Sequence, residues 1–477
     1  MLFHSLLFLG FFSIVYPLYL VMSHRWQNRL LFVGSWIFYG AWNWRYLFLL
    51  ALSTVIDYAA ALGIDGTTDR HRRRVWLGLS IVSQTTLLCI FKYYDFFATN
   101  FQELMASFGL TVHPYFLRTA VPIGISFYTF QTMSYVLDVY RGKLHAARSF
   151  VDFGVYVSYF PHLIAGPIMR GTSLLPQILE LRTVTWAKVY RGAYMFLWGL
   201  FLKVVIADNV APIVDAVFGT TGPYEGPRVL MGVYAFAFQI YCDFAGYSYM
   251  AIGISLAMGI VLVENFKRPY FSKNISEFWR RWHISLSSWF RDYVFSPLYV
   301  YLQDRTRIKA LPLGLRHGVA FAITLFATDF LLGMWHGVGW NYGLFGLYHA
   351  LMIWIYYYTR NIWDRMHSVV QTVLTFHVAC GGWLIFRATS LNQIIEMFRS
   401  LLVGLRPSLV GRLPGVWLAA TLALVLIAVE VLQNRENDNM MVLKWPRSLK
   451  YAFVTLLGCM ILIFGNSGER PFIYFQF

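Results

Sequence analysis

The feature that most constrains this chain is the recurrence of apolar runs, each long enough to cross the hydrocarbon core of a bilayer as a helix. About 20 residues suffice for one crossing, and such runs lie at 2–21, 30–62, 75–98, 117–139, 188–207, 229–262, 318–335, 340–358, 415–433 and 449–465, with shorter ones at 150–165 and 371–386. Inside a bilayer the backbone finds no water to bond, so spans of this kind are helical. We predict an all-α, polytopic membrane protein of about ten to twelve spans, re-entrant pieces included, that forms a single domain over residues 1–477.

Charge is concentrated in the short loops between these runs. A net charge of +16 would suggest nucleic acid in a soluble protein, but only 13% of the residues are charged and 58% are hydrophobic. The basic clusters lie at 70–74, 141–148, 305–316 and 435–450, and the positive-inside rule accounts for them. We therefore expect a lipid bilayer as the environment and no nucleic-acid partner. Residues 1–21 read as a retained first helix with its N-terminus outside.

The second apolar run, 30–62, is longer than one crossing needs. The positive-inside rule places the loops near residues 70 and 141 in the cytoplasm. The run then has to leave and return on one side of the membrane, and the polar, aromatic stretch YGAWNWR at 39–45 is the predicted reversal.

Familiar catalytic and metal-binding signatures are missing from the sequence. There is no GxSxG, GxxxxGK[ST], HExxH or CxxC pattern, so serine hydrolase, ATPase and zinc protease interpretations are poor. The four cysteines, Cys89, Cys242, Cys380 and Cys459, stand apart within apolar segments. They indicate neither a disulfide framework nor a metal site, and we expect no tightly bound cofactor.

Residues 276–292, SEFWRRWHISLSSWFRD, have the pattern of an amphipathic helix. Apolar side chains recur at intervals of three and four, and basic or hydroxylated side chains recur about a quarter-turn away. One interpretation is a helix lying in the headgroup interface. The other is a helix lining a water-filled or substrate-filled cavity, where arginines attract an anionic donor or acceptor and a histidine serves recognition or proton transfer. The residues assigned to that cavity are Arg280, Arg281, Trp282, His283, Ser287 and Arg291.

A second candidate, His336, ends an apolar run in the stretch LLGMWHGVGWN. A lone histidine on an apolar helix is often a hydrogen-bonded structural residue. Function is favoured here because Gly337 and Gly339 interrupt the helix, and non-helical backbone at membrane depth needs protein or a cavity around it. Trp335 offers a rigid wall and Asn341 a neutral donor and acceptor, and both are assigned to the same cavity. Ionisable groups in hydrocarbon are costly and are functional candidates by default.

A histidine in such a cavity suits general-base work, since it can take the proton from a hydroxyl as that oxygen attacks an acyl carbon. Asp329 lies seven residues before His336. At about 1.5 Å per residue this is roughly 10 Å, too far for a direct Asp-His pair. Without a serine or cysteine nucleophile motif, the simplest scheme is direct attack of an acceptor hydroxyl on a thioester.

Beyond this chemistry, seven segments of the chain resemble the membrane-bound O-acyltransferase (MBOAT) family, in its bacterial polysaccharide branch typified by alginate O-acetylases. They are PIGISFYTFQTMSYVLDVYRG (122–142), FPHLIAGPIMR (160–170), KVVIADNVAPIVD (203–215), FQIYCDFAGYSYMAIG (238–253), ENFKRPYFSKNISEFWRRWHISLSSWFRDY (264–293), MWHGVGWNYGLFGLYHA (334–350) and PFIYFQF (471–477). The segments with WRRWHISLS and MWHG, in that order and separation, are the most specific.

The resemblance implies a ring of tilted helices around a thinned centre, with a funnel on each membrane face and a narrow tunnel between them. The family's catalytic histidine, in the WHG motif, corresponds to His336, and its second functional histidine, after RRW, corresponds to His283. Family members move an acyl group from a cytoplasmic thioester, here expected to be acetyl-CoA, to a hydroxyl. In the polysaccharide branch the group is used outside the cell, usually with a periplasmic SGNH-like partner acyltransferase. A multi-pass protein of the bacterial plasma (inner) membrane is therefore expected.

The chain departs from the alginate pattern at Tyr249, where related sequences have an acidic residue, and after Pro297, where LYVYLQDRTRIKALPLG replaces a glycine-rich basic stretch. The phrase GMWHGVGWNYGLFGLYHA instead resembles the branch that exports D-alanine to teichoic acids. Three hypotheses stay open: acetyl transfer towards an exported or cell-wall, alginate-like polysaccharide; D-alanyl transfer to teichoic acid from a carrier-protein thioester; and a non-catalytic carrier of an acylated donor.

Overall fold

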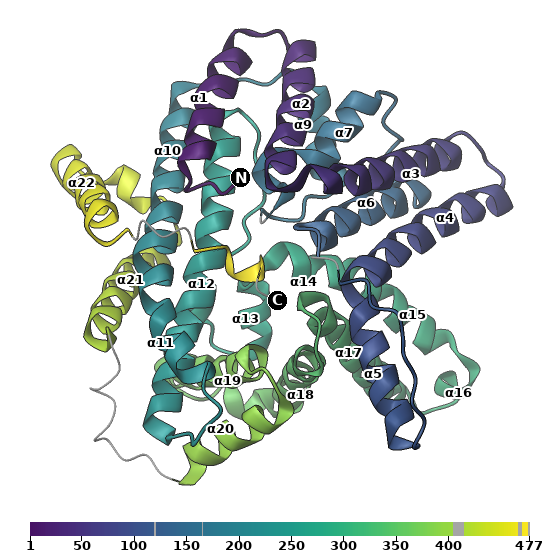
Figure 1. Ribbon diagram of the computed structural model, residues 1–477, viewed down its shortest axis with the longest axis vertical. Coiled ribbons are helices and arrows are strands. Elements are labelled where there is room, and N and C mark those ends of the chain that lie inside the picture. Colours follow the sequence, from purple (N-terminus) through teal and green to yellow (C-terminus); the bar gives the residue numbers. More distant parts are fainter. Residues whose placement is uncertain (119–120, 165, 404–414, 466–469, 476–477) are drawn as a thin grey trace. The chain divides into compact units, whose positions relative to one another are not determined.

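The computed structural model describes residues 1–118, 121–164, 166–403, 415–465 and 470–475, and within these ranges the chain is helical with no strand (Figure 1). The predicted all-α fold is confirmed. Contacts divide the chain into two compact units, Met1–Tyr194 with Ala251–Val263, and Met195–Met250 with Glu264–Phe477. The prediction of one domain over 1–477 stays a prediction.

The first unit contains the N-terminal helices and the start of α10. Its elements are α1 (Leu6–Val21), α2 (His24–Asn43), η1 (Trp44–Tyr46), α3 (Leu47–Asp65), α4 (Arg70–Leu88), η2 (Cys89–Tyr93), α5 (Tyr94–Ser107), α6 (Ile125–Tyr140), α7 (Phe150–Ser158), α8 (Phe160–Leu163), α9 (Gly171–Leu179) and α10 (Trp186–Leu200).

The second unit contains most of the long helix α12 and everything that follows residue 263. Its elements are η3 (Phe201–Ala207), α11 (Asp208–Phe218), α12 (Gly226–Ala257), η4 (Pro269–Phe271), α13 (Ile275–Arg281), α14 (Ile284–Phe290), η5 (Arg291–Phe295), α15 (Ser296–Asp304), α16 (Thr306–Lys309), α17 (Leu313–His336), α18 (Trp340–Trp363), α19 (Ser368–Arg387), α20 (Leu391–Val403), α21 (Val416–Glu436), η7 (Met441–Lys444), α22 (Arg447–Phe464) and η8 (Ile473–Phe475).

Eight helical runs in the described part of the chain are long and apolar enough to cross a membrane. They are His24–Asp65, Arg70–Ser107, Trp186–Phe218, Gly226–Ala257, Leu313–His336, Ser368–Arg387, Val416–Glu436 and Arg447–Phe464. The chain is therefore a multi-pass membrane protein. The number is below the predicted ten to twelve, partly because α1 and α6 have only 16 residues each and because 150–165 is broken between α7 and α8. The ring and its tunnel stay a prediction.

A helix break lies within residues 39–45, where the second apolar run was predicted to reverse; the reversal itself stays a prediction. Helix α2 ends at Asn43, a 3₁₀ turn follows, and α3 begins at Leu47. The Asn43 side chain accepts a hydrogen bond from the backbone N–H of Arg45 at 3.1 Å. A polar side chain thus satisfies a backbone donor at the break, as helix ends require.

Helices α3 and α4 are joined by a buried polar cluster. Ser80 and Gln84 of α4 donate to the two carboxylate oxygens of Asp57 of α3, at 2.6 and 2.9 Å. The Ser53 hydroxyl also donates to the Gln84 side-chain oxygen. Each of these groups is buried, so they satisfy one another away from water.

The hairpin of α17 and α18 carries His336 at the end of its first helix. The two helices lie side by side (Figure 1) and touch backbone to backbone at two glycines. A Cβ added to Gly333 would lie 2.1 Å from the carbonyl oxygen of Tyr342, and one added to Gly346 would lie 1.9 Å from that of Asp329. These distances fix the hairpin closely and leave little room for its helices to slide.

We predict that Gly346→Ala destabilises the protein because the methyl group meets backbone, which cannot move aside as a flexible side chain would. The expected loss is about 1–3 kcal/mol, seen as a lower melting temperature in detergent-resolved size-exclusion chromatography. The matched control is Gly314→Ala on α17, where an added Cβ finds nothing within 4 Å; it should match or exceed wild type. Equal melting temperatures for the two variants would contradict this packing.

Candidate active site

The stretch predicted as one amphipathic helix over 276–292 is two short helices that meet at His283. Helix α13 ends at Arg281, and His283 takes the left-handed conformation with φ 42° and ψ 52° before α14 begins. The prediction of a continuous helix is therefore wrong. The cause is distant in sequence: the carbonyl of Asn265 accepts from the N–H of Ile284 at 3.0 Å, and its side-chain oxygen accepts from the N–H and hydroxyl of Ser285. Asn265 thereby caps α14.

His283 is fully buried at this break. The helical spacing had predicted that it shares a face with the exposed arginines, and it does not. Its exposed fraction is 0%. Its ring meets Phe244 edge to face at 4.6 Å between centroids and Trp335 at 5.9 Å. Burial lowers the pKa of His283 to about 3, because an apolar environment penalises the charged imidazolium. The ring is therefore neutral near pH 7.

His336 is the last residue of α17, and the predicted helix interruption after it is confirmed. Gly337 is extended and α18 begins at Trp340. A Cβ at Gly337 would lie 2.3 Å from the ring of Tyr342, so only glycine lets the chain pass this ring. His336 is 4% exposed, which places an ionisable ring in a buried position at the tip of the hairpin.

The structure brings the two candidate histidines together. Their ring centroids are 6.2 Å apart, and the ring of Trp335 lies 5.2 Å from His336. Phe345 and Phe386 also contact His336, at 6.0 and 5.5 Å. The aromatic walls and the two closely spaced, buried imidazoles fit a site from which water is largely excluded.

A hydrogen-bond partner of His336 is a tyrosine near the other end of the sequence. The hydroxyl of Tyr474 lies 3.2 Å from Nδ1 of His336, and its ring packs on Phe244 at 4.6 Å. Tyr474 belongs to the short turn η8, while residues 476–477 of the PFIYFQF segment lie outside the described part of the chain. An aspartate on α17 is thus not needed to hold the ring, in agreement with the distance argument against Asp329.

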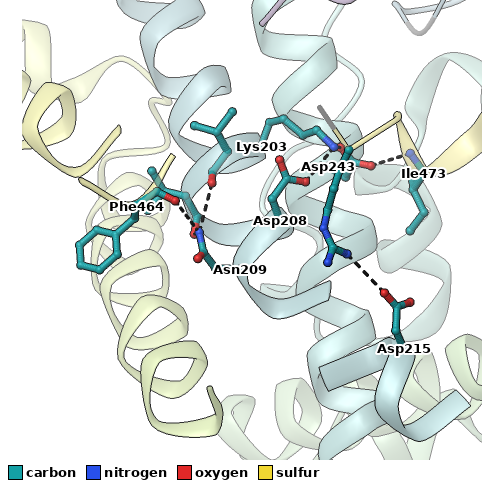
Figure 2. A network of polar contacts seen from close by, with 10 residues as sticks. Lys203, Asp208, Asn209, Asp215, Asp243, Phe464 and Ile473 are labelled. Atoms are coloured by element: carbon teal, nitrogen blue, oxygen red, sulfur yellow. Dashed lines mark hydrogen bonds and ion pairs between the residues drawn. The ribbon is translucent and has the colours of Figure 1, made fainter. Parts of the chain in front are cut away.

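The same turn is tied to a buried ion cluster (Figure 2). The backbone N–H of Ile473 donates to Oδ2 of Asp243 at 2.6 Å. Nζ of Lys203 lies 2.8 Å from Oδ1 of Asp243 and 3.0 Å from Oδ1 of Asp208. All three charged side chains are at most 6% exposed. One cation is thereby shared by two carboxylates on neighbouring helices.

The arginines assigned to the cavity lie outside this buried cluster. Arg280 is exposed and bonds the Ser276 hydroxyl at 3.0 Å. Arg291 is 65% exposed and pairs with its neighbour Asp292. Arg281 is half-buried and pairs with Glu277 one turn earlier, so its charge is compensated locally. Of these three arginines, Arg280 and Arg291 present their positive charge at the surface.

The other assigned residues support the site's walls. Trp282 is 1% exposed and packs on Trp383 at 4.6 Å. Ser287 donates to the Trp282 carbonyl at 3.3 Å, bridging the break at His283. Asn341 donates to the carbonyls of Phe386 and Ala388, each at 3.1 Å. Asn341, predicted to face substrate, therefore joins α18 to the end of α19.

In the described ranges, no three histidine, cysteine, aspartate or glutamate side chains lie together in a way that could hold a metal ion. The chemical group at the centre of the site is the buried imidazole of His336, surrounded by aromatic rings and in hydrogen-bond contact with the Tyr474 hydroxyl. That arrangement is competent for proton transfer to or from a hydroxyl.

Comparison with known proteins identifies the class. Residues 144–394, more than half of the chain, match the MBOAT, membrane-bound O-acyltransferase family. The chain belongs to this family and is an acyltransferase, as the motifs around both histidines predicted.

Three relatives show which kinds of acyltransferase the chain is similar to. The chain is 39% identical over 408 residues to the probable alginate O-acetylase AlgI of Pseudomonas aeruginosa, covering 84% of this chain and 75% of that one. It is 33% identical over 463 residues to the peptidoglycan O-acetyltransferase of Helicobacter pylori, covering 91% and 81%. It is 31% identical over 281 residues to the teichoic acid D-alanyltransferase of Bacillus subtilis, covering 55% and 68%.

Sequence reasoning missed Tyr474, Phe244, Asp243 and Lys203 as parts of this site. A signal was present for the charged pair, since Lys203 and Asp243 are isolated charges inside apolar runs, where ionisable residues need partners. Tyr474 gave no such signal, because its partner stands 138 residues away.

Low pH should destabilise the protein through His283. The folded-state pKa of about 3 is below the unfolded value near 6.5, so protons favour the unfolded chain once the pH falls below about 6.5. The stabilisation is complete above that pH and is lost at roughly 1.4 kcal/mol per pH unit as the pH falls towards 3. The variant His283→Asn keeps a residue that tolerates the left-handed conformation but does not titrate.

Melting temperatures of the two proteins at about pH 7.5 and pH 5 test this: the pH-dependent drop should be larger for wild type. The exposed His317, replaced as His317→Asn, serves as the control and should retain the wild-type drop. A drop in His283→Asn equal to that of wild type would show that His283 is not buried as a neutral ring.

Proposed function

We propose that the protein transfers an acetyl group, with acetyl-CoA as the cytoplasmic donor, towards hydroxyls of an exported or cell-wall polysaccharide. The observation that carries this proposal is the buried pair of His336 and His283, 6.2 Å apart, with Tyr474 on Nδ1 of His336. Support for acetyl and for a glycan comes from the relatives named for alginate and peptidoglycan O-acetylation.

In the proposed reaction His336 acts as general base at Nε2, the ring nitrogen opposite the Tyr474 contact. It takes the proton of the acceptor hydroxyl as that oxygen attacks the thioester carbonyl carbon. The C–O ester bond forms, the C–S bond breaks, and the imidazolium returns the proton to the leaving thiolate. Tyr474 accepts a hydrogen bond from Nδ1–H, which holds the ring in the tautomer that leaves Nε2 basic.

The other assigned residues support binding. The neutral His283 orients the reacting group by hydrogen bonding, and Trp282 and Trp335 keep water out. Arg280 and Arg291, exposed on either side of the α13–α14 break, attract the phosphates of the donor. No cofactor beyond the donor substrate is needed for this scheme.

The proposed setting is the bacterial plasma membrane, with the donor taken from the cytoplasm. An acetyl group released on the outer face would need an acceptor there, so we include an SGNH-like periplasmic acyltransferase as partner and the polysaccharide as final acceptor.

D-alanyl transfer from a carrier-protein thioester is the second candidate, favoured by the 31% identity to a teichoic acid D-alanyltransferase over 55% of this chain. Purified protein in lipid vesicles, supplied with either labelled acetyl-CoA or a D-alanyl carrier protein, separates the two by which thioester it consumes. Hydrolysis or transfer of neither donor, with movement of the intact donor across the bilayer, would instead support a non-catalytic carrier.

We expect His336→Gln to abolish acyl transfer while the protein still inserts and elutes as a folded species. Glutamine fills similar space but cannot take a proton, and loss of a general base typically costs about 100- to 10,000-fold in rate. The measurement is transfer of labelled acetyl from acetyl-CoA to a hydroxyl acceptor. The exposed His317, replaced as His317→Gln, is the control. Near-normal transfer by the His336 variant would contradict the assignment of His336 as the general base.

A further inference from the structure

We propose that Asp243 is a positioning residue: paired with Lys203, it holds segment 470–475 by a backbone hydrogen bond and thereby keeps Tyr474 on His336. This inference rests on the proposed function of His336, since it concerns how that ring is held.

We call Lys203, Asp243 and the backbone N–H of Ile473 the anchor of segment 470–475. The ammonium group of Lys203 lies between two carboxylates (Figure 2). Its side chain is 1% exposed, and that of Asp243 is 3% exposed. Removing one partner from a buried ion pair leaves an uncompensated charge and is strongly unfavourable. Lys203 therefore fixes where the Asp243 carboxylate can lie, and it lies 2.8 Å from Oδ1 of that carboxylate.

The second oxygen of Asp243 receives the N–H of Ile473 at 2.6 Å. A hydrogen bond to an ionised carboxylate is shorter and stronger than one between neutral groups. Its donor is backbone, so the contact constrains the path of the chain itself rather than one side chain. Tyr474, the next residue, is placed by that path.

A second attachment is weaker. Arg470 lies 3.3 Å from Oδ2 of Asp215, but these side chains are 36% and 56% exposed. Exposed ion pairs contribute little because water and salt screen them. The buried contact at Ile473, three residues nearer to Tyr474, therefore carries most of the positioning.

Phe244, the residue after Asp243 on α12, provides the aromatic surface on which segment 470–475 packs. Its ring packs on Phe472 at 5.6 Å and on Tyr474 at 4.6 Å, and it also meets His283 at 4.6 Å. Helix α12 thus presents the carboxylate and the aromatic surface from adjacent positions. Displacement of segment 470–475 would disturb both histidines at once.

The cleanest test removes the N–H donor and leaves the buried charges intact. Ile473 is the first residue of the 3₁₀ turn η8, a position where the fixed φ of proline fits and its missing N–H breaks no bond within the turn. Ile473→Pro is therefore compared with Ile473→Ala, which shortens the same side chain but keeps the N–H.

We expect kcat for acetyl transfer to be roughly 10- to 100-fold lower in Ile473→Pro than in Ile473→Ala, with similar KM for acetyl-CoA, because misplacement by about 1 Å can cost about 100-fold. Backbone amide exchange of Tyr474 and Phe475 should be faster in the proline variant. Equal kcat and equal exchange in the two variants would overturn the inference.

A second comparison addresses the carboxylate. Asp243→Ala should speed amide exchange in segment 470–475, and Asp243→Asn, which keeps an acceptor oxygen, should partly restore protection. Asp208→Ala removes the other carboxylate on Lys203 but leaves the hydrogen bond between Asp243 and Ile473 in place, so exchange at Ile473 and Tyr474 should stay near wild type. Loss of protection in Asp208→Ala as large as in Asp243→Ala would mean that general damage to the ion cluster, not anchoring, explains the effect.

The proposed function and the positioning role of Asp243 would be contradicted by different results. If wild type transfers no acyl group, or if His336→Gln is fully active, the proposed function fails, while the exchange measurements still report on the anchor. If wild type is active, His336→Gln is inactive, and the proline and alanine variants do not differ, the positioning role alone is wrong.

Discussion

The ion cluster of Lys203 with Asp208 and Asp243 is the interaction on which the described site most depends. A charge in an apolar interior must find a partner or lose its charge, so these residues fix α12 against the run from η3 into α11. Lys203 lies within η3, a π-helical stretch, and such widened turns recur where helices carry function. Because buried Lys203 must be paired, it fixes the Asp243 carboxylate. The second oxygen of that carboxylate is then available to segment 470–475.

Both candidate histidines lie where a helix stops. His283 occupies the left-handed residue between α13 and α14, and His336 closes α17 before an extended glycine. Side chains in mid-helix emerge at fixed angles, whereas these two breaks let the rings approach within 6.2 Å. Aromatic neighbours and backbone capping then satisfy the interrupted chain, as burial demands. The helix interruptions bring two buried imidazoles together inside an otherwise apolar protein.

Prediction from the sequence succeeded where the deciding information was local. Runs of apolar residues predicted the helices, and the glycines after His336 predicted its helix end. It failed over 276–292, because the cap on α14 comes from Asn265, outside the amphipathic pattern. It did not anticipate that Asn341 donates to carbonyls of another helix, and it could not find Tyr474. Each of these depends on contacts between segments that no periodicity encodes.

Because some charges are buried and others exposed, they should respond differently to ionic strength. At physiological salt, dissolved ions largely screen interactions between exposed charges that are more than about 8 Å apart, so the electrostatic field of Arg280 and Arg291 at the surface weakens as salt rises. Lys203 and Asp243, closed off from solvent, are shielded from those ions. A salt titration therefore separates the proposed capture of an anionic donor from the geometry in which it would react, and it does so without altering a single residue.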